Sequence, residues 1–163
     1  NSVRLGGTKF DAAITDYIRK KHNLAIGEQT AERIKISVGS ALRMTEKLSI
    51  EVKGRDMISG LPKIITVTSD DVNEAIQNCL DGIVNAVREL LNQTPPELSA
   101  DIMEKGIVMS GGSSLLRNFD QLIAQATGVS TFVADDPILC VARGTGVALE
   151  NLDLYKKSIL ATR

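Results

Sequence analysis

The sequence predicts an α/β fold. Three observations carry this prediction: apolar residues recur at helical spacing in several segments, two runs alternate with a period of two, and the last third has the order strand, helix, strand, helix. Alternating runs around a glycine-bracketed loop indicate an antiparallel hairpin, whereas strand–helix–strand order indicates parallel strands joined by a crossover helix. The chain is therefore expected to contain both kinds of pairing.

Composition fits this prediction and excludes several other classes. The chain has 163 residues, of which 43% are hydrophobic and 24% charged, as in ordinary soluble domains. Its formal net charge of −1 implies no general attraction to nucleic acid or anionic lipid, and no apolar run approaches the roughly 18 residues of a membrane span. The opening NSVRLGG is not a secretory leader and lacks an initiator Met, which suggests a fragment. Two cysteines without CxxC spacing predict a reduced, cytoplasmic compartment.

Residues 1–68 are expected to form two helices and a hairpin. Residues 2–5 alternate weakly before Gly6 and Gly7, which predicts a short strand and a turn. Thr8 is the expected cap of a helix that ends at Asn23. Asparagine tolerates the left-handed backbone conformation in which helices often end. Residues 28–39 predict a second amphipathic helix, and residues 48–53 and 64–68 predict the strands of the hairpin.

The basic run RKKHN at the end of the first helix allows two interpretations. It could contact an anion or a nucleic acid, or it could place cations at a helix C-terminus, where the helix dipole favours them. The second interpretation is favoured because the run has no interleaved aromatic residue and the sequence has no other basic patch.

A long helix over about residues 69–93 is the strongest predicted element. Ser69 is its expected cap, and Asp70 and Asp71 place negative charge in the first turn. Its apolar face also carries Cys79, for which packing is the favoured role, and consists of Val72, Ile76, Leu80, Ile83, Val87, Leu90 and Leu91. The Thr-Pro-Pro sequence at residues 94–96 ends this helix and begins a short one to Lys105.

Residues 106–149 carry the strand–helix–strand–helix order. Residues 106–109 predict a short buried strand, followed by the sequence SGGSS and a helix that ends before Gly128. Residues 129–134 predict the second strand. Asp136 and Pro137 are the expected N-cap and first residue of a final helix through Leu149.

The strand-to-helix junction at residues 110–114 is the first candidate binding feature. Adjacent glycines let a ligand approach the backbone, and the following helix would present free N–H groups and the positive end of its dipole. The segment is neither a Walker A loop nor a GxGxxG motif. A tight turn without any ligand therefore remains the favoured alternative on local sequence.

Glu32 and Lys35 are the second candidate feature. Their i,i+3 spacing places them on one helix face, where they could simply pair with each other at the surface. Alternatively, they could hold polar groups of a ligand, such as ribose hydroxyls. The residues themselves leave both possibilities open.

No catalytic residue and no metal site is predicted. His22 is the single histidine and lies in the basic helix end, and the cysteines are too far apart for zinc spacing. The serines at residues 110, 113 and 114 have no local base partner, which argues against a serine nucleophile. Asp135 and Asp136 could bind a cation, but helix capping explains them more simply.

Four segments together resemble the MreB/Mbl family of bacterial actin homologues, in register over nearly all of the chain. They are GTKFDAAITDYIRKKHNLAIGEQTAERIKISVGSA, VKGRDMISGLPKIITVTSDDVNEAI, TPPELSADIMEKGIVMSGGSSLLRNFDQLI and ADDPILCVARGTGVALEN. The resemblance covers only the C-terminal half of that family's proteins. It implies part of an actin-like ATPase fold, with residues 1–7 and 69–150 as a ribonuclease H-like inner lobe and residues 8–68 as a smaller α+β outer lobe. Residues 151–163 would be a tail that contacts the missing first domain.

The resemblance also implies a nucleotide site. GIVMSGGSSLL is similar to the family's loop on the adenosine side of ATP, which implicates Gly111, Gly112, Ser113 and Ser114. TAERIK is similar to the helix that closes over adenine and ribose, which implicates Glu32, Arg33 and Lys35. Ser113 stands where the family usually has a third glycine; its Cβ could narrow the site, or its hydroxyl could add a hydrogen bond.

The family's role follows as an expectation for the intact parent protein. Its members are ATP-dependent filament proteins that lie in the cytoplasm beneath the inner face of the cell membrane and determine rod cell shape. Expected partners are further copies of the protein, the membrane-anchored adaptor RodZ and the cell-wall synthesis machinery. Membrane contact and Mg²⁺ would both be supplied through the missing half, and no nucleic acid is expected.

ATP hydrolysis is not expected of this chain alone, because nothing in it resembles the family's phosphate hairpins or the acidic residues that position magnesium and water. The parent is expected to be a weak ATPase. Two alternatives remain: a domain of a related actin-fold ATPase of the chaperone or sugar-kinase type, and a protein-interaction module without nucleotide binding.

Overall fold

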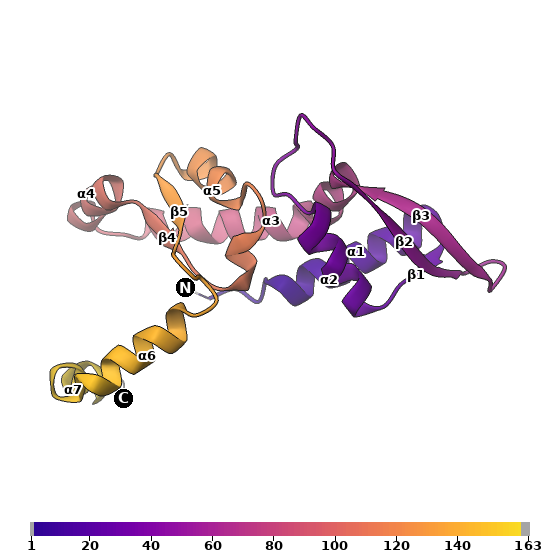
Figure 1. The fold of residues 1–163 in the computed structure, drawn as a ribbon. Helices are drawn as coiled ribbons and strands as arrows, with labels where there is room; N and C mark the ends of the chain where they lie inside the picture. Colours follow the sequence, from indigo (N-terminus) through magenta and orange to yellow (C-terminus); the bar gives the residue numbers. More distant parts are fainter. Residues whose placement is uncertain (1, 161–163) are drawn as a thin grey trace.

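The computed structural model describes residues 2–160, with side chains described up to residue 156. The helices and strands follow one another in the order seen in Figure 1. They are α1 (Gly7–His22), β1 (Leu24–Ala25), α2 (Glu28–Val38), β2 (Ser49–Asp56), β3 (Pro62–Thr68), α3 (Ser69–Asn92), α4 (Pro96–Lys105), β4 (Ile107–Met109), the 3₁₀ turn η1 (Gly112–Leu115), α5 (Phe119–Thr127), β5 (Thr131–Val133), α6 (Cys140–Glu150) and α7 (Leu152–Leu160).

An antiparallel sheet and three helices enclose most of the core. The strands lie in the order β1–β2–β3, and the predicted hairpin of β2 and β3 is confirmed, with Val52 opposite Ile65 in its register. Strand β1 was not predicted, because two residues give no alternating pattern. The fully buried apolar side chains come from α1, α2, α3 and this sheet, and include Phe10, Ile14, Ile18, Leu24, Ile34, Val52, Val67, Val72, Ile76 and Leu80.

Strands β4 and β5 form a separate parallel pair with α5 as their crossover, as the sequence predicts. The expectation that residues 106–109 form a buried strand is only partly right. Val108 on β4 is 57% exposed and Phe132 on β5 is 46% exposed, so one face of this pair is open. The alternate residues face α5, whose Phe119 and Ile123 are buried.

The N-terminal prediction is wrong in two details. Residues 2–5 form no strand, since no described strand pairs with them. Helix α1 begins at Gly7 with Gly6 as its N-cap, so Thr8 lies inside the first turn and does not cap it. The end of the helix is confirmed, because Asn23 adopts the left-handed conformation with φ 52°.

Helix α3 begins with a capping box, and its N-cap lies one residue before Ser69, the cap that the sequence predicts. Thr68 is the N-cap; its hydroxyl accepts from the Asp71 N–H, and the Asp71 carboxylate accepts from the Thr68 N–H. The Ser69 hydroxyl instead accepts a hydrogen bond from the N–H of Leu48, which lies in the connection between α2 and β2. The predicted apolar face is otherwise correct, except that Leu90 is 47% exposed.

The final helix also begins later than expected. Asp136 has φ 46° and its carbonyl accepts from Leu139 N–H, so residues 136–139 form a turn and α6 starts at Cys140. The Asp136 carboxylate pairs with Arg143 at 2.5 Å. Within the described residues no side chain of α6 is buried, and Figure 1 shows α6 and α7 extending away from the body of the protein. The expected tail includes residues 161–163, which lie outside the described residues; the lobe boundaries stay a prediction.

Candidate functional site

A cavity of about 480 Å³ lies between the start of α1, helix α2 and the segment that follows β4. These parts are distant in sequence and are brought together by the fold. The cavity is lined by Gly7, Thr8, Phe10, Asp11, Glu32, Lys35, Ile36, Gly39, Gly112, Ser113, Leu115, Leu116, Arg117 and Ile138. Both candidate binding features of the sequence analysis therefore contribute to one site.

Helix α2 supplies one wall. Its buried face of Ala31, Ile34 and Val38 packs into the core, which leaves Glu32 and Lys35 on the side that borders the cavity. Lys35 pairs with Asp11 of α1 rather than with Glu32: its Nζ lies 2.9 Å from Asp11 Oδ1 and 3.1 Å from Oδ2. Both side chains of this pair are only 16% exposed, so the ammonium group is held in place beside the cavity.

The glycine-rich junction supplies the opposite wall. Gly111 has φ 86°, a conformation that favours glycine, and its N–H donates to the Pro137 carbonyl. Ser114 is buried, and its hydroxyl donates to the Gly111 carbonyl at 2.6 Å. These two residues shape the turn, whereas Gly112 and Ser113 border the cavity. A Cβ on Gly112 would have no protein atom within 4 Å, so the backbone there is open to a ligand.

One expectation about this site is wrong, and three residues that the resemblance implicated lie outside the cavity lining. The helix after the junction begins at Phe119, after a short 3₁₀ turn, so the junction does not lead directly into the N-terminus of α5 as expected. Arg33 is exposed and does not line the cavity, although the resemblance implicated it. Gly111 and Ser114 also stay outside the lining and act on the turn.

Several lining residues were missed by the sequence analysis. Asp11 and Arg117 line the cavity, but neither is among the binding residues that the sequence predicts. Ile36 and Leu115 are 65% and 56% exposed, respectively, on the two walls. An apolar residue on the polar side of α2 was the available sign that Ile36 faces something other than water.

Arg117 holds the two walls together. Its guanidinium Nη1 donates to the carbonyls of Ile36 at 3.0 Å and Gly39 at 3.3 Å, at the end of α2. These carbonyls lack partners inside a helix, so the arginine acts as a C-terminal cap supplied from the opposite wall. The main chain adds a second link, because the Ala41 N–H donates to the Arg117 carbonyl at 2.8 Å.

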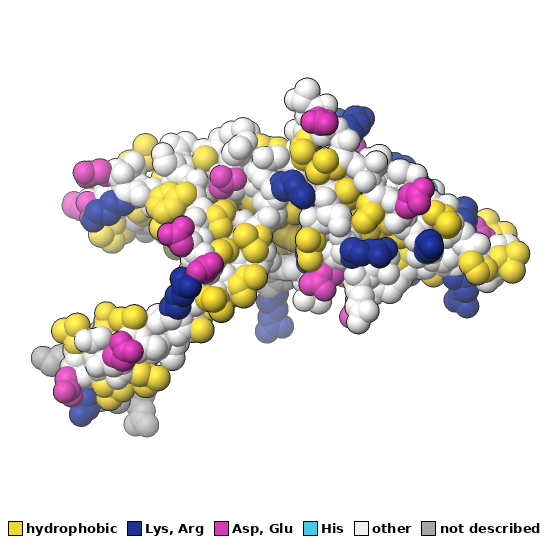
Figure 2. All heavy atoms as spheres, viewed as in Figure 1, with side chains coloured by type: hydrophobic (Ala, Val, Ile, Leu, Met, Phe, Trp, Pro, Cys, Tyr) yellow, Lys and Arg dark blue, Asp and Glu magenta, His cyan; other side chains and the backbone are white. Residues whose placement is uncertain are grey.

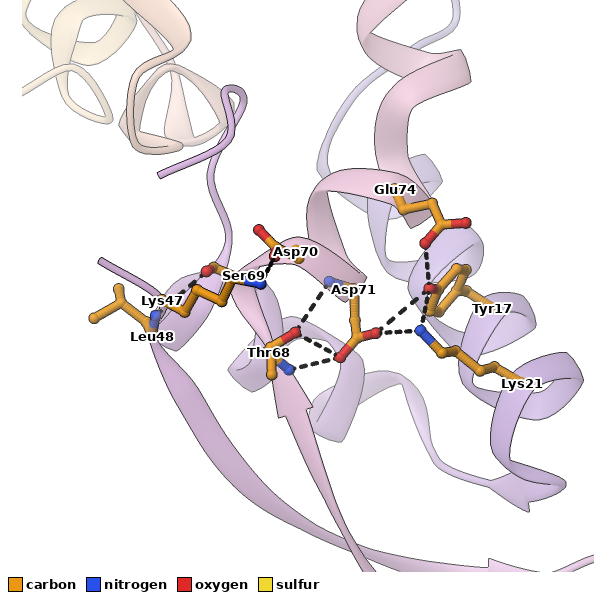
Figure 3. Close-up of polar contacts among 9 residues, drawn as sticks. All are labelled: Tyr17, Lys21, Lys47, Leu48, Thr68, Ser69, Asp70, Asp71 and Glu74. Carbon is orange, nitrogen blue, oxygen red and sulfur yellow. Dashed lines mark hydrogen bonds and ion pairs between the residues drawn. The ribbon is translucent and has the colours of Figure 1, made fainter. Parts of the chain in front are cut away.

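A polar cluster lies where the end of α1 meets the start of α3 (Figure 3). Lys21 Nζ lies 2.6 Å from Asp71 Oδ1 and 2.9 Å from the Tyr17 hydroxyl, which donates to Glu74 at 2.6 Å. Burial tends to raise the pKa of Asp71, but the hydrogen bonds from Lys21 and Thr68 outweigh it and lower this pKa to about 2. Lys21 of the basic run is thus engaged in an intramolecular contact at the helix end.

The sequence is similar to proteins of known family over nearly its whole length. The family model described as MreB/Mbl protein matches residues 1–157. The chain belongs to the MreB/Mbl family. It is 50% identical over 155 residues to the cell shape-determining protein MreB of Escherichia coli strain K12, covering 95% of this chain and 45% of that protein. It is 45% identical over 161 residues to Mbl of Bacillus subtilis strain 168, covering 99% of this chain and 48% of that protein. The chain therefore spans about half the length of these relatives.

Solved structures confirm the predicted fold class, an α/β fold that forms part of the actin-like architecture. MreB5 of Spiroplasma citri bound to ADP superposes with a TM-score of 0.90 at 38% identity, over 98% of this chain and 47% of that one. The MamK double helical filament superposes with a TM-score of 0.62 at 22% identity, over 81% of this chain and 40% of that one, and supports the fold alone.

Among the residues that the structure describes, no group of three or more His, Cys, Asp or Glu side chains could hold a metal ion. None of the described helices combines the length and the apolar character needed to cross a membrane.

Proposed function

We propose that this chain is the nucleotide-binding second domain of an MreB/Mbl-type filament protein. The observation that carries the proposal is the meeting of Glu32 and Lys35 with Gly112 and Ser113 around one cavity. The related MreB5 of Spiroplasma citri is described bound to ADP and to AMPPNP, which supports an adenine nucleotide such as ATP as the ligand.

The lining suggests how such a ligand is held. Ile36 and Leu115 offer exposed apolar surface on opposite walls, suited to the faces of a flat base. The Glu32 carboxylate accepts hydrogen bonds from ribose hydroxyls, while the Lys35 ammonium, oriented by Asp11, donates to ligand oxygens. Gly112 lets the ligand approach the backbone, and the Ser113 hydroxyl adds a polar contact.

The chain binds nucleotide without hydrolysing it. Phosphoryl transfer requires a metal ion and a positioned water beside the terminal phosphate. Mg²⁺ and those groups belong to the other half of the parent protein, which would be a weak ATPase. The affinity of this chain for ATP is accordingly expected to be weaker than about micromolar, or −8.2 kcal/mol.

In the cell, the parent protein would form filaments that determine rod shape, beneath the inner face of the cytoplasmic membrane. Self-assembly is supported by the family assignment and by the cell shape-determining relatives. RodZ and the cell-wall synthesis machinery are its proposed partners. The family assignment argues against a chaperone or sugar-kinase domain, and an interaction module that binds no nucleotide is an outcome of the test below.

Calorimetric titration of ATP and ADP into the chain tests the site. Gly112→Val is expected to weaken binding at least about tenfold, because the new side chain occupies open space in the cavity. Gly144→Val is the matched control, since a Cβ at Gly144 is equally free of neighbours and lies on α6, outside the lining. No detectable binding by the unsubstituted chain, or equal binding by the Gly112→Val variant, would refute the proposed site.

A further inference from the structure

A small group of polar side chains lies inside the molecule, next to residues that line the cavity. Figure 2 shows that charged side chains on the visible face are spread among apolar ones and do not gather into one patch. Below the surface, Ser40 is 0% exposed, Asn73 is 6% exposed and Asn118 is half-buried. We term these three residues the Ser40 cluster. Buried polar groups are costly unless they are hydrogen-bonded, so their partners show what the cluster holds.

Ser40 joins the two walls of the cavity. It directly follows Gly39, which lines the cavity at the end of α2. Its Oγ accepts a hydrogen bond from Asn118 Nδ2 at 2.9 Å and donates to the Leu42 carbonyl at 2.7 Å. Asn118 directly follows Arg117 of the opposite wall, and the backbones of Ser40 and Arg117 pair as a parallel bridge. One buried hydroxyl therefore links the chain after α2 to the chain after the glycine-rich junction.

Asn73 attaches this link to helix α3. Its Nδ2 donates to the carbonyls of Ser40 at 3.1 Å and Ala41 at 3.0 Å, which uses both hydrogens of the amide. On the same helix, Val72 and Ile76 are 1% and 0% exposed, so the core fixes the position of the amide. The end of α2 is thereby held against a rigid element of the fold.

Asn118 uses its side chain for this link and not for its own helix. It is the N-cap residue of α5, and asparagine is a favoured N-cap because its side chain can accept from the first free N–H groups. Among the described residues it makes no such capping bond, and its amide donates to Ser40 instead. Its φ of 59° suits asparagine or glycine, but only asparagine also supplies the donor.

We infer that the Ser40 cluster positions the two walls of the cavity and thereby sets its affinity for nucleotide. This inference rests on the proposed function and adds three positioning residues behind the groups that would touch the ligand. The apolar walls are close to the cluster in sequence, since Ile36 lies four residues before Ser40 and Leu115 three residues before Asn118. A gap of about 0.5–1 Å between a wall and a flat base forfeits a quarter to a half of their contact energy, so small movements of either wall reduce affinity.

The cluster and Arg117 act on different sides of the same connection. The Arg117 side chain is exposed, and water competes for the carbonyls that it holds. At Ser40 water is excluded, and hydrogen bonds in such surroundings are electrostatically stronger than in water. The buried cluster is therefore the stiffer of the two links.

Calorimetric titration of ATP tests the inference, at a temperature where melting curves show every variant to be folded. Ser40→Ala and Asn118→Gly are each expected to raise the dissociation constant about threefold to tenfold. Asn118→Gly keeps the left-handed backbone and removes only the amide. Asn73→Ala should act in the same direction. Because the Asn118 site is half-buried, its variant carries the test if Ser40→Ala fails to fold.

Two matched controls remove similar groups away from the cavity. Ser69→Ala deletes another buried serine hydroxyl, which accepts from the Leu48 N–H. Asn23→Gly deletes the side chain of another left-handed asparagine, with φ 52°. Neither residue lines the cavity, so both variants should bind ATP as the unsubstituted chain does.

Hydrogen exchange followed by NMR without nucleotide reports the link between the walls directly. The Ala41 N–H donates to the Arg117 carbonyl at 2.8 Å. Its exchange should be at least about tenfold faster in Ser40→Ala and Asn118→Gly than in the controls. The Leu80 N–H in the middle of α3 should exchange equally in all of them, because the change is local and not a general loss of stability.

The outcomes separate this inference from the proposed function. Unchanged ATP affinity in both cluster variants, or an equal loss of affinity in Ser69→Ala, would overturn the positioning role. Absence of ATP binding by the unsubstituted chain would refute the proposed function, and Ala41 exchange would then decide the inference alone. Faster exchange confined to the cluster variants would support the cluster as the link between the walls, whereas equal exchange in all variants would overturn it.

Discussion

Replacement of Arg117 by alanine tests whether the two walls of the cavity are held by a side chain. The guanidinium donates to two carbonyls at the end of α2, those of Ile36 and Gly39. A hydrogen bond to a charged group is typically worth about 1.5–3 kcal/mol. Arg117 is exposed, and water can reach the carbonyls it leaves, so we expect Arg117→Ala to lower the free energy of unfolding by only about 1 kcal/mol.

The effect on nucleotide affinity should be larger than this small change in stability suggests. Without the guanidinium, the carbonyls of Ile36 and Gly39 lose this donor while the main-chain bond from Ala41 to Arg117 remains. The end of α2 is then held less firmly, and the ligand must restore the cavity's shape when it binds. We expect the dissociation constant for ATP to rise about threefold to tenfold by calorimetry, with urea unfolding measured in parallel. Arg117→Lys should restore part of the affinity, because one ammonium group has enough N–H donors for both carbonyls but is carried by a side chain of different shape.

Arg143→Ala is the matched control for this substitution. Like Arg117, Arg143 is an exposed arginine. It pairs with Asp136 and lies outside the cavity lining. Full affinity in the Arg117→Ala variant would refute the reasoning, because it would show that a clamp by this side chain is unnecessary.

Further expectations concern the half-buried ion pair, one glycine and acid stability. Lys35→Met should lower the free energy of unfolding in urea by about 2 kcal/mol, because it leaves the Asp11 carboxylate without its partner; adding Asp11→Asn should return part of this loss. Gly39→Ala should destabilise by about 2–3 kcal/mol, since its Cβ would overlap the Lys35 carbonyl, whereas Gly112→Ala should change stability little. Asp71 has a pKa of about 2 in the folded chain, below its unfolded value, so its stabilisation is present above pH 4 and is lost as pH falls from 4 to 2. The stability difference between wild type and Asp71→Asn, about 1–2 kcal/mol at pH 6, should therefore vanish in this window.

Each of these three expectations would be contradicted by a specific result. Additive losses in the Asp11–Lys35 double variant would mean that the pair does not couple the two helices. Equal stability of the two alanine variants would remove the steric argument at Gly39. A constant difference between wild type and Asp71→Asn across the acid range would show that this carboxylate is not held ionised by its neighbours.

The sequence predicted the elements whose signal is local. The helix over residues 69–92 and the hairpin followed from periodicity, and the stop at Asn23 followed from its tolerance of positive φ. Errors occurred where a neighbour in space decides the outcome. Residues 2–5 have a weak strand pattern but no described strand to pair with. Ser69 does not cap α3, because its hydroxyl accepts a hydrogen bond from the Leu48 N–H instead.

The sequence predicted each half of the candidate site separately, because helix α2 and the glycine-rich junction each have a recognisable local pattern. Glycines in a tight turn and two charges on one helix face are visible in sequence, and each had an ordinary structural explanation. What makes them one site is the pairing of Lys35 with Asp11 across 24 residues and of Arg117 with the end of α2 across about 80. Long-range contacts of this kind produce no periodic pattern in the sequence. Each joins a single polar side chain to a partner that becomes its neighbour only in the folded chain. A cavity wall held by such contacts can be found only when the chain is folded.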